Sequence, residues 1–207
     1  MLPNPVRYAT LATLALGAIV SFGGLQGIGR ALTVAELDVT AGETPFLNKL
    51  TPNPEAFAAA QRAQAVAFRN SIENMRWPRV VVLFGLSAAA SLVFVSALRL
   101  RWPSGVQRSN LAKLLSRAAI GAAVLRTLDG AQELVIVRAV ATAWDRTLAE
   151  HHVEAADAGV TAGVLSIASV GTTVMVTGLF VLAANYFRSE RIQQTFVLID
   201  RNTPEEE

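Results

Sequence analysis

Three long stretches of the chain contain no charged residue. They cover 8–29, 80–98 and 158–187, with lengths of 22, 19 and 30 residues. A helix rises 1.5 Å per residue, so about 20 residues cross the ~30 Å hydrocarbon core of a bilayer. Each stretch is therefore long enough to form a transmembrane helix.

The composition agrees with this interpretation. Hydrophobic residues make up 52% of the 207 residues and charged residues 16%, with a mean hydropathy of +0.40, whereas a soluble domain carries about 25% charged residues. A net charge of +2 is too small for a nucleic-acid-binding surface, and the absence of cysteine excludes disulfides, thiolate metal sites and cysteine nucleophiles. The sequence predicts an all-α integral membrane protein that contacts the lipid bilayer and binds no nucleic acid.

A fourth apolar segment, 118–144, is more ambiguous because it contains charges. These are Arg126, Asp129, Glu133 and Arg138. Each charge near a helix centre costs about 2.5–3.5 kcal/mol on insertion, so the segment could instead lie on the membrane surface. Its flanks favour crossing: residues 99–117 hold five Lys or Arg and no acid, whereas 145–157 hold four acids and one Arg. Positive charge is retained in the cytoplasm, so flanks of opposite sign indicate a spanning helix.

The predicted fold therefore has four transmembrane helices, at about 9–29, 79–100, 118–143 and 159–187. We expect 1–207 to form a single polytopic membrane domain with both termini cytoplasmic. Residues 31–77 are then extracytoplasmic and 188–207 form a cytoplasmic tail. The basic residues of the 31–77 segment count against this orientation. All Trp and Tyr residues support the four spans, because each lies at a span end, where amphipathic rings prefer the headgroups: Tyr8, Trp77, Trp102, Trp144 and Tyr186.

The first span could alternatively be a signal peptide that is removed. One Arg precedes an apolar stretch, as in such peptides. The stretch is longer than a usual signal core, and no clear Ala-x-Ala cleavage site follows it, which favours a retained helix.

The first outer segment contains the start of a helix. Asn53 is a suitable N-cap, with Pro54 at the first helical position and Glu55 in the first turn. Four apolar side chains then fall within a sector of about 60°, which Gln61 and Gln64 interrupt: Phe57, Phe68, Ile72 and Met75. We predict an amphipathic helix that caps the bundle, lies in the outer leaflet or binds a partner, and that ends or kinks at Pro78. Upstream, 31–50 is predicted to be a polar loop.

The charges of the third span form the main candidate site. At 100° per residue, Asp129 and Glu133 lie about 60° and 20° from Arg126, so the three share one helix face. Ionisable groups inside a membrane serve proton relays and ion paths, or form a structural cluster that fixes how helices pack. Both interpretations stay open, since one cluster on one helix defines no path.

The fourth span carries a polar stripe with a GxxxG pair at one end. Its members share one helix face: Gly159, Gly163, Ser166, Ser169, Thr173 and Thr177. Small residues let helix backbones approach, and hydroxyls bond across the interface, so we expect helix packing here. The pairs Gly17–Ser21 and Gly23–Gly27 of the first span have the same interpretation.

The sequence contains no motif for soluble catalysis. His151 and Glu154 could share a helix face as metal ligands, but His152 is the only other histidine, so we expect no metal and no cofactor. Arginine outnumbers lysine by 16 to 2, which suggests a GC-rich bacterium. The sequence thus predicts a non-enzymatic multi-pass protein of the bacterial inner membrane, a structural or interaction subunit with a protein partner or further copies of itself. The alternative is an ion- or proton-coupled channel or transporter component that uses Arg126, Asp129 and Glu133.

Overall fold

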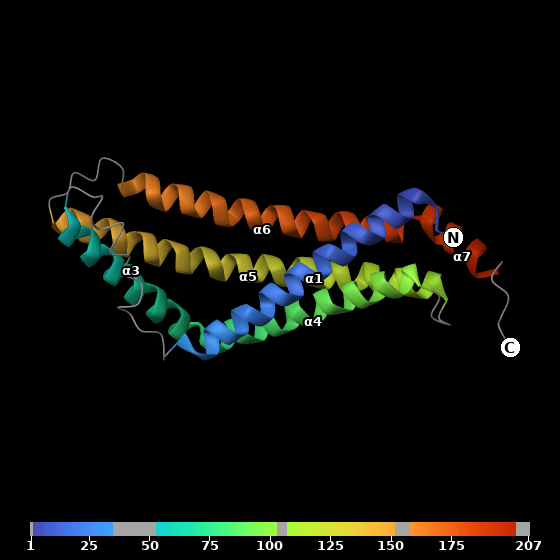
Figure 1. Ribbon diagram of the computed structural model, residues 1–207, viewed down its shortest axis with the longest axis horizontal. Coiled ribbons are helices and arrows are strands. Elements are labelled where there is room, and N and C mark those ends of the chain that lie inside the picture. The colour runs from blue at the N-terminus through green and yellow to red at the C-terminus, as the bar shows by residue number, and fades with distance from the viewer. Residues whose placement is uncertain (1, 35–52, 103–106, 152–157, 202–207) are drawn as a thin grey trace. The chain divides into compact units, whose positions relative to one another are not determined.

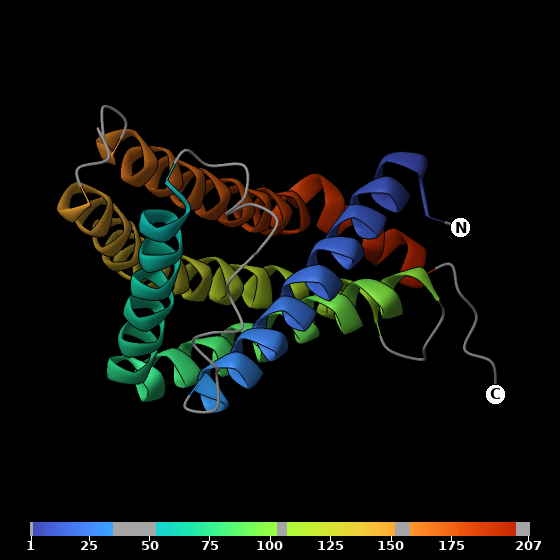
Figure 2. The ribbon, with the colours of Figure 1, turned by 60° about the vertical axis from the view of Figure 1, so that its left-hand side comes forward.

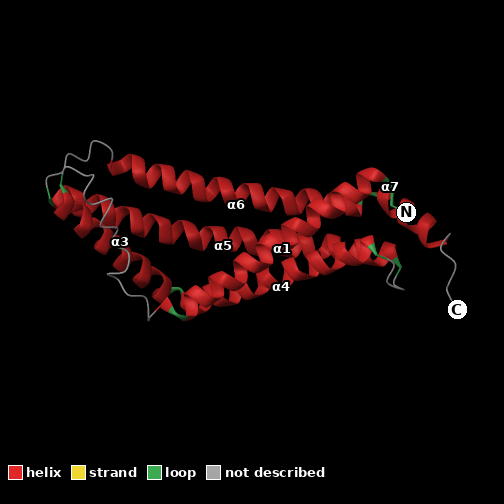
Figure 3. Ribbon diagram, viewed as in Figure 1, coloured by secondary structure: helices red, strands yellow, loops and turns green. Residues whose placement is uncertain are grey.

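A computed structural model describes residues 2–34, 53–102, 107–151 and 158–201. Within these ranges every regular element is a helix (Figure 3), which confirms the all-α prediction for this part of the chain. In chain order (Figure 1), the helices are α1 (Asn4–Leu32), α3 (Pro54–Asn74), α4 (Arg76–Arg101), α5 (Arg108–Glu150), α6 (Ala158–Arg188) and α7 (Glu190–Arg201).

Three of the described helices are long and apolar enough to cross a membrane. They are Asn4–Leu32, Arg76–Arg101 and, within α6, Gly163–Arg188. The first two enclose the predicted spans 9–29 and 79–100 and extend a few residues further at their ends. The helix that contains the predicted 118–143 span, α5, has 43 residues and is not among the three, because charged residues dilute its apolar stretch.

The chain divides into two compact units. Unit 1 consists of Met1–Gly27, Val82–Thr127 and Val174–Glu207, and unit 2 consists of Ile28–Val81 and Leu128–Thr173. The boundaries fall inside α1, α4, α5 and α6, so each of these helices contributes to both units.

The core of unit 1 combines small residues of α5 with larger residues of α4 and α6. Ala119 and Ala122 of α5 are fully buried against Val93 of α4 and Phe180 of α6. Alanine keeps the facing helices close, and the larger side chains fill the remaining space. A second buried cluster in unit 1 packs Phe196 of α7 with residues of α1, α4, α5 and α6: Val6, Leu100, Leu115 and Phe187.

Within unit 1, α1 packs directly on the backbone of α4, which it crosses in Figure 2. A Cβ atom on Gly17 would lie 2.9 Å from the Ala90 carbonyl oxygen and 2.9 Å from the Phe94 amide nitrogen. The hydroxyls of Ser21 and Ser91 are hydrogen-bonded across the same interface at 2.7 Å. Only glycine allows the two backbones to approach this closely.

Of the second predicted pair in α1, Gly23 and Gly27, only Gly27 contacts α4. Gly27 faces Leu83 of α4, and Gly24 lies against Ser87, but Gly23 has no atom within 4 Å of its Cβ position. The contacting face of α1 therefore runs through Gly17, Gly24 and Gly27.

In unit 2, α3 begins where the sequence predicts. The Asn53 side chain accepts a hydrogen bond from the Ala56 amide at 3.2 Å, as an N-cap does. The ring of Phe57 meets that of Trp144 of α5 edge to face, with 4.9 Å between centroids. The rest of the predicted apolar sector packs into a cluster with the end of α1 and with α5: Ala31, Val34, Phe68, Ile72, Met75, Ile136 and Val140.

The break between α3 and α4 lies three residues before Pro78. Met75 ends α3, its amide bonded to the Ile72 carbonyl, and α4 begins at Arg76. Pro78 thus occupies the first turn of α4, where an amide hydrogen has no partner within the helix, so proline costs little there. The predicted 31–50 loop begins later than expected, since α1 continues to Leu32, and 35–52 lie outside the described residues.

The C-terminal segment forms a separate helix, α7, that follows α6. Ser189 separates the two helices, and the Gln193 side chain donates a hydrogen bond to the Phe187 carbonyl at the end of α6, at 2.7 Å. Phe196 of α7 is fully buried. The Asp200 carboxylate accepts hydrogen bonds from the amides of Arg108 and Ser109, at 3.1 and 3.2 Å, and so caps the N-terminus of α5.

Candidate functional site

Among the described residues, Asp129 of α5 is the one charged residue that is buried, with 4% of its surface exposed. Its partner is Arg79 of α4, whose Nη2 lies 3.7 Å from the Asp129 Oδ1. This separation exceeds that of a normal hydrogen bond, so the contact is an ion pair. A carboxylate and a guanidinium from two helices therefore meet inside unit 2.

A third helix, α6, packs against α5 at Gly130, next to this ion pair. A Cβ atom on Gly130 would overlap the side chain of Thr173 on α6, so these two residues are in close contact. Gly130 directly follows Asp129 in α5. Its missing side chain lets α6 pack beside the ion pair.

On the three helices that meet here, several buried polar atoms lack a hydrogen-bond partner among the described residues. They are Nη1 of Arg79, Oε1 of Gln132 and Oγ1 of Thr173, all inaccessible to solvent. We call Arg79, Asp129, Gln132 and Thr173 the polar cluster. A buried polar atom without a partner costs about 1–3 kcal/mol. The polar cluster thus offers donors and acceptors from three helices that packing alone does not satisfy.

The structure places the three predicted site residues on one helix with different burial. Asp129 is buried, whereas Arg126 and Glu133 are half-buried. Arg138, the fourth charge of the 118–144 segment, is exposed. Two members of the polar cluster, Arg79 and Gln132, were missing from the sequence prediction. Gln132 lies three residues after Asp129 and shares its face, so the 100° periodicity of the helix could have identified it. Arg79 belongs to another helix, and the periodicity of α5 gives no information about it.

The predicted hydroxyl stripe of α6 has an unusual hydrogen-bonding state. The hydroxyl oxygens of Ser169, Thr173 and Thr177 are buried and have no partner among the described residues. Several other helical threonines bond the carbonyl four residues earlier, as Thr172 bonds Ala168 at 2.9 Å. The three hydroxyls therefore differ from that of Thr172 in having no hydrogen-bond partner among the described residues.

The remainder of the stripe is less enclosed. Ser166 is half-buried, and nothing lies within 4 Å of a Cβ position on Gly163. The surroundings of Gly159 lie outside the described side chains. Further along α6, Phe180 and Ala184 continue the hydroxyl face and are buried in unit 1.

Of the two adjacent histidines, only His151 lies among the described residues. His151 Nδ1 lies 2.9 Å from the Thr147 carbonyl oxygen, while His152 and Glu154 fall outside the described residues. Within the described part of the chain, no three His, Asp or Glu side chains are grouped so that they could hold a metal ion.

Comparison with protein-family models, with curated proteins and with solved structures finds no match for this chain.

Proposed function

We propose that this chain is a non-enzymatic protein of a bacterial inner membrane, with four transmembrane helices, that serves as a structural or interaction subunit. The observation that carries the proposal is the exposed apolar surface of α1 and α6. In each helix only 17% of the most apolar 18-residue window is buried within the chain. Surfaces this apolar are stable against lipid or against another apolar helix.

The exposed face of α5 supports a fourth span. Its large exposed side chains fall within about 80° of one another and on the side opposite Arg126: Ile120, Val124, Leu128 and Val135. This face contains no charge over the 20 residues between Arg117 and Arg138. Asp129 points to the interior, so α5 presents an apolar face long enough for a bilayer core while its charged face packs against protein.

The distribution of charge supports an orientation with both termini cytoplasmic. Unit 1, which contains the N-terminus, the 102–107 connection and the tail, carries 10 Lys or Arg and 5 Asp or Glu. Unit 2, which contains the 33–53 and 151–157 connections, carries 8 and 11. Lys and Arg beside a connection favour its retention in the cytoplasm, and Arg99, Arg101 and Arg108 flank the uncharged 102–107 connection, which supports placing it and the termini there.

Purification in a mild detergent tests the interaction role. We expect the full-length chain to elute with a second protein in fixed stoichiometry, or as a defined homo-oligomer without conductance in liposomes. A monomer without a partner would contradict the role, because the exposed faces of α1 and α6 would then serve only as lipid contacts.

A second candidate function is an ion- or proton-coupled channel or transporter component, and the polar cluster favours it. A buried carboxylate that faces a guanidinium, with unsatisfied amide and hydroxyl groups beside it, has the composition of an intramembrane proton path. Asp129→Asn and Glu133→Gln keep the side-chain shape but cannot exchange a proton. In liposomes with a pH gradient, this candidate predicts flux for the wild type and loss of flux in either folded variant. A wild type without flux rejects it.

A further inference from the structure

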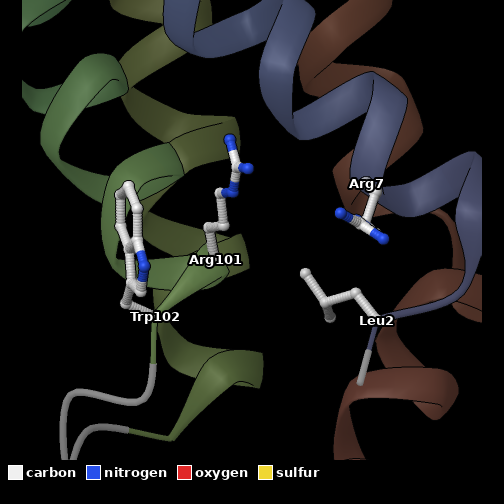
Figure 4. A pocket seen from close by; sticks show the side chains of 4 residues that line it. All are labelled: Leu2, Arg7, Arg101 and Trp102. Atoms are coloured by element: carbon white, nitrogen blue, oxygen red, sulfur yellow. The ribbon is translucent and has the colours of Figure 1, made fainter.

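Two arginines from different helices line one cavity in unit 1. Arg7 lies near the start of α1 and Arg101 at the end of α4, and the cavity between them has a volume of about 220 Å³. Leu2 and Trp102 complete its lining, with Leu2 and Arg7 on one side and Arg101 and Trp102 on the other (Figure 4). A cavity of this size holds much more than a single water, which needs about 10–15 Å³.

The positive charge of this cavity has no acidic counterpart among the described residues. Neither Arg7 nor Arg101 forms an ion pair there. The described part of unit 1 contains two acids, Glu190 and Asp200, and Asp200 caps α5 instead. Two guanidinium groups beside one small cavity therefore create a site that favours an anion.

The remaining lining indicates the kind of anion. The Arg101 guanidinium lies over the Trp102 ring, 5.3 Å from its centroid, which restrains its orientation. Trp102 and Tyr8, which follows Arg7 in α1, are largely exposed, as expected of amphipathic rings at the headgroup level of a bilayer. Leu2 adds an apolar wall. An arginine fork matches the oxygens of a phosphate group, and the apolar wall with the indole ring suits the glycerol and upper acyl chains of a lipid.

We propose that the cavity binds the phosphate group of an anionic phospholipid, with Arg7 and Arg101 as its ligands. Basic pockets between helix ends on the cytoplasmic side of a membrane bind such headgroups. This inference rests on the proposed placement of the chain in a membrane with the N-terminus in the cytoplasm. Inorganic phosphate carries the same binding group without acyl chains, so the two sources can be separated by experiment.

The test is calorimetric titration of the full-length protein in a neutral detergent. The probes are short-chain phosphatidylglycerol, short-chain phosphatidylcholine and inorganic phosphate. The variant is Arg7→Gln with Arg101→Gln, and both side chains are exposed, so the fold should survive. Arg99→Gln is the matched control, because Arg99 is an exposed arginine of the same last turn of α4 that does not line the cavity.

We expect saturable binding of phosphatidylglycerol that the double variant weakens about tenfold or more and that Arg99→Gln leaves unchanged. Equal binding of phosphatidylcholine, which carries the same phosphate group but no net charge, would overturn the preference for an anionic lipid. Equal weakening by Arg99→Gln would overturn the site, because general charge attraction would then explain the data. Inorganic phosphate that binds as tightly as phosphatidylglycerol would overturn the lipid assignment. If the double variant does not fold, Arg7→Lys with Arg101→Lys takes its place. This variant keeps both positive charges but removes the paired donors of each guanidinium, so it should still weaken binding.

Failure of this site is distinguishable from failure of the proposed function. Alkaline carbonate extraction of membranes reports whether the chain is integral. A protein that resists extraction but does not prefer phosphatidylglycerol contradicts the lipid site alone, whereas a protein released by carbonate contradicts its placement in the membrane.

Discussion

The buried pair of Arg79 and Asp129 is the residue-scale feature on which the site depends. Charges inside a protein lose their hydration, so a buried pair adds little net stability, but the loss of one partner is costly. The sequence identifies Asp129 as an ionisable group inside an apolar helix. It does not identify Arg79, since periodicity shows which residues share a face of one helix but not which helix that face meets.

Replacing Arg79 should therefore destabilise the protein more than replacing an exposed arginine. We expect Arg79→Leu to lower the free energy of unfolding by about 3–5 kcal/mol, because it removes the cation beside a buried carboxylate. Arg79→Leu combined with Asp129→Asn should recover part of this loss. Thermal melting in detergent measures both. Arg138→Leu, at an exposed position of α5, is the control and should change stability by less than about 0.5 kcal/mol.

Alanine substitutions at Gly17 and at Gly23 of α1 should change the stability of the protein in opposite directions. Gly17→Ala places a methyl group 2.9 Å from backbone atoms of Ala90 and Phe94, which cannot rotate away, so we expect a loss of about 1–3 kcal/mol. Gly23→Ala meets nothing within 4 Å and should be neutral or stabilising by up to about 1 kcal/mol through helix propensity. Melting curves of the two variants that shift alike would contradict the close α1–α4 packing.

At the scale of elements, the sequence predicts where a helix begins but not which helices pack against one another. The start of α3 follows from Asn53 and Pro54 alone, since a helix cap depends on a few neighbouring residues. The tail gives no comparable signal: burial of Phe196 depends on residues of four other helices in its cluster. The capping of α5 by Asp200 likewise joins positions about 90 residues apart.

The Asp200 cap predicts a local effect of substitution. Asp200→Ala removes the acceptor for two amides at the start of α5 and should cost about 0.5–2 kcal/mol. Hydrogen exchange at Arg108 and Ser109 should accelerate, because their amides lose a partner. Glu190→Ala, at an exposed position of the same helix α7, should leave both exchange rates unchanged. Unchanged exchange in Asp200→Ala would contradict the cap.

At the scale of the whole molecule, the central property is how often the chain crosses the membrane. Charge-free stretches are sufficient to locate α1, α4 and the apolar part of α6, because length and composition decide a simple span. They are insufficient for α5, whose proposed crossing depends on where its charges point. Periodicity places Asp129 on a different face from Val124 and Leu128, and the structure adds that the face of Asp129 is the buried one.

The most direct test of this account compares the two ends of α5. The chain has no cysteine, so Asn110→Cys and Glu150→Cys each provide one thiol, and both positions are exposed. In intact cells, a membrane-impermeant maleimide should label the cysteine at 150 and leave the one at 110 unlabelled until the membrane is permeabilised. Labelling of both positions, or of neither, in intact cells would place both ends of α5 on the same side and contradict a spanning α5.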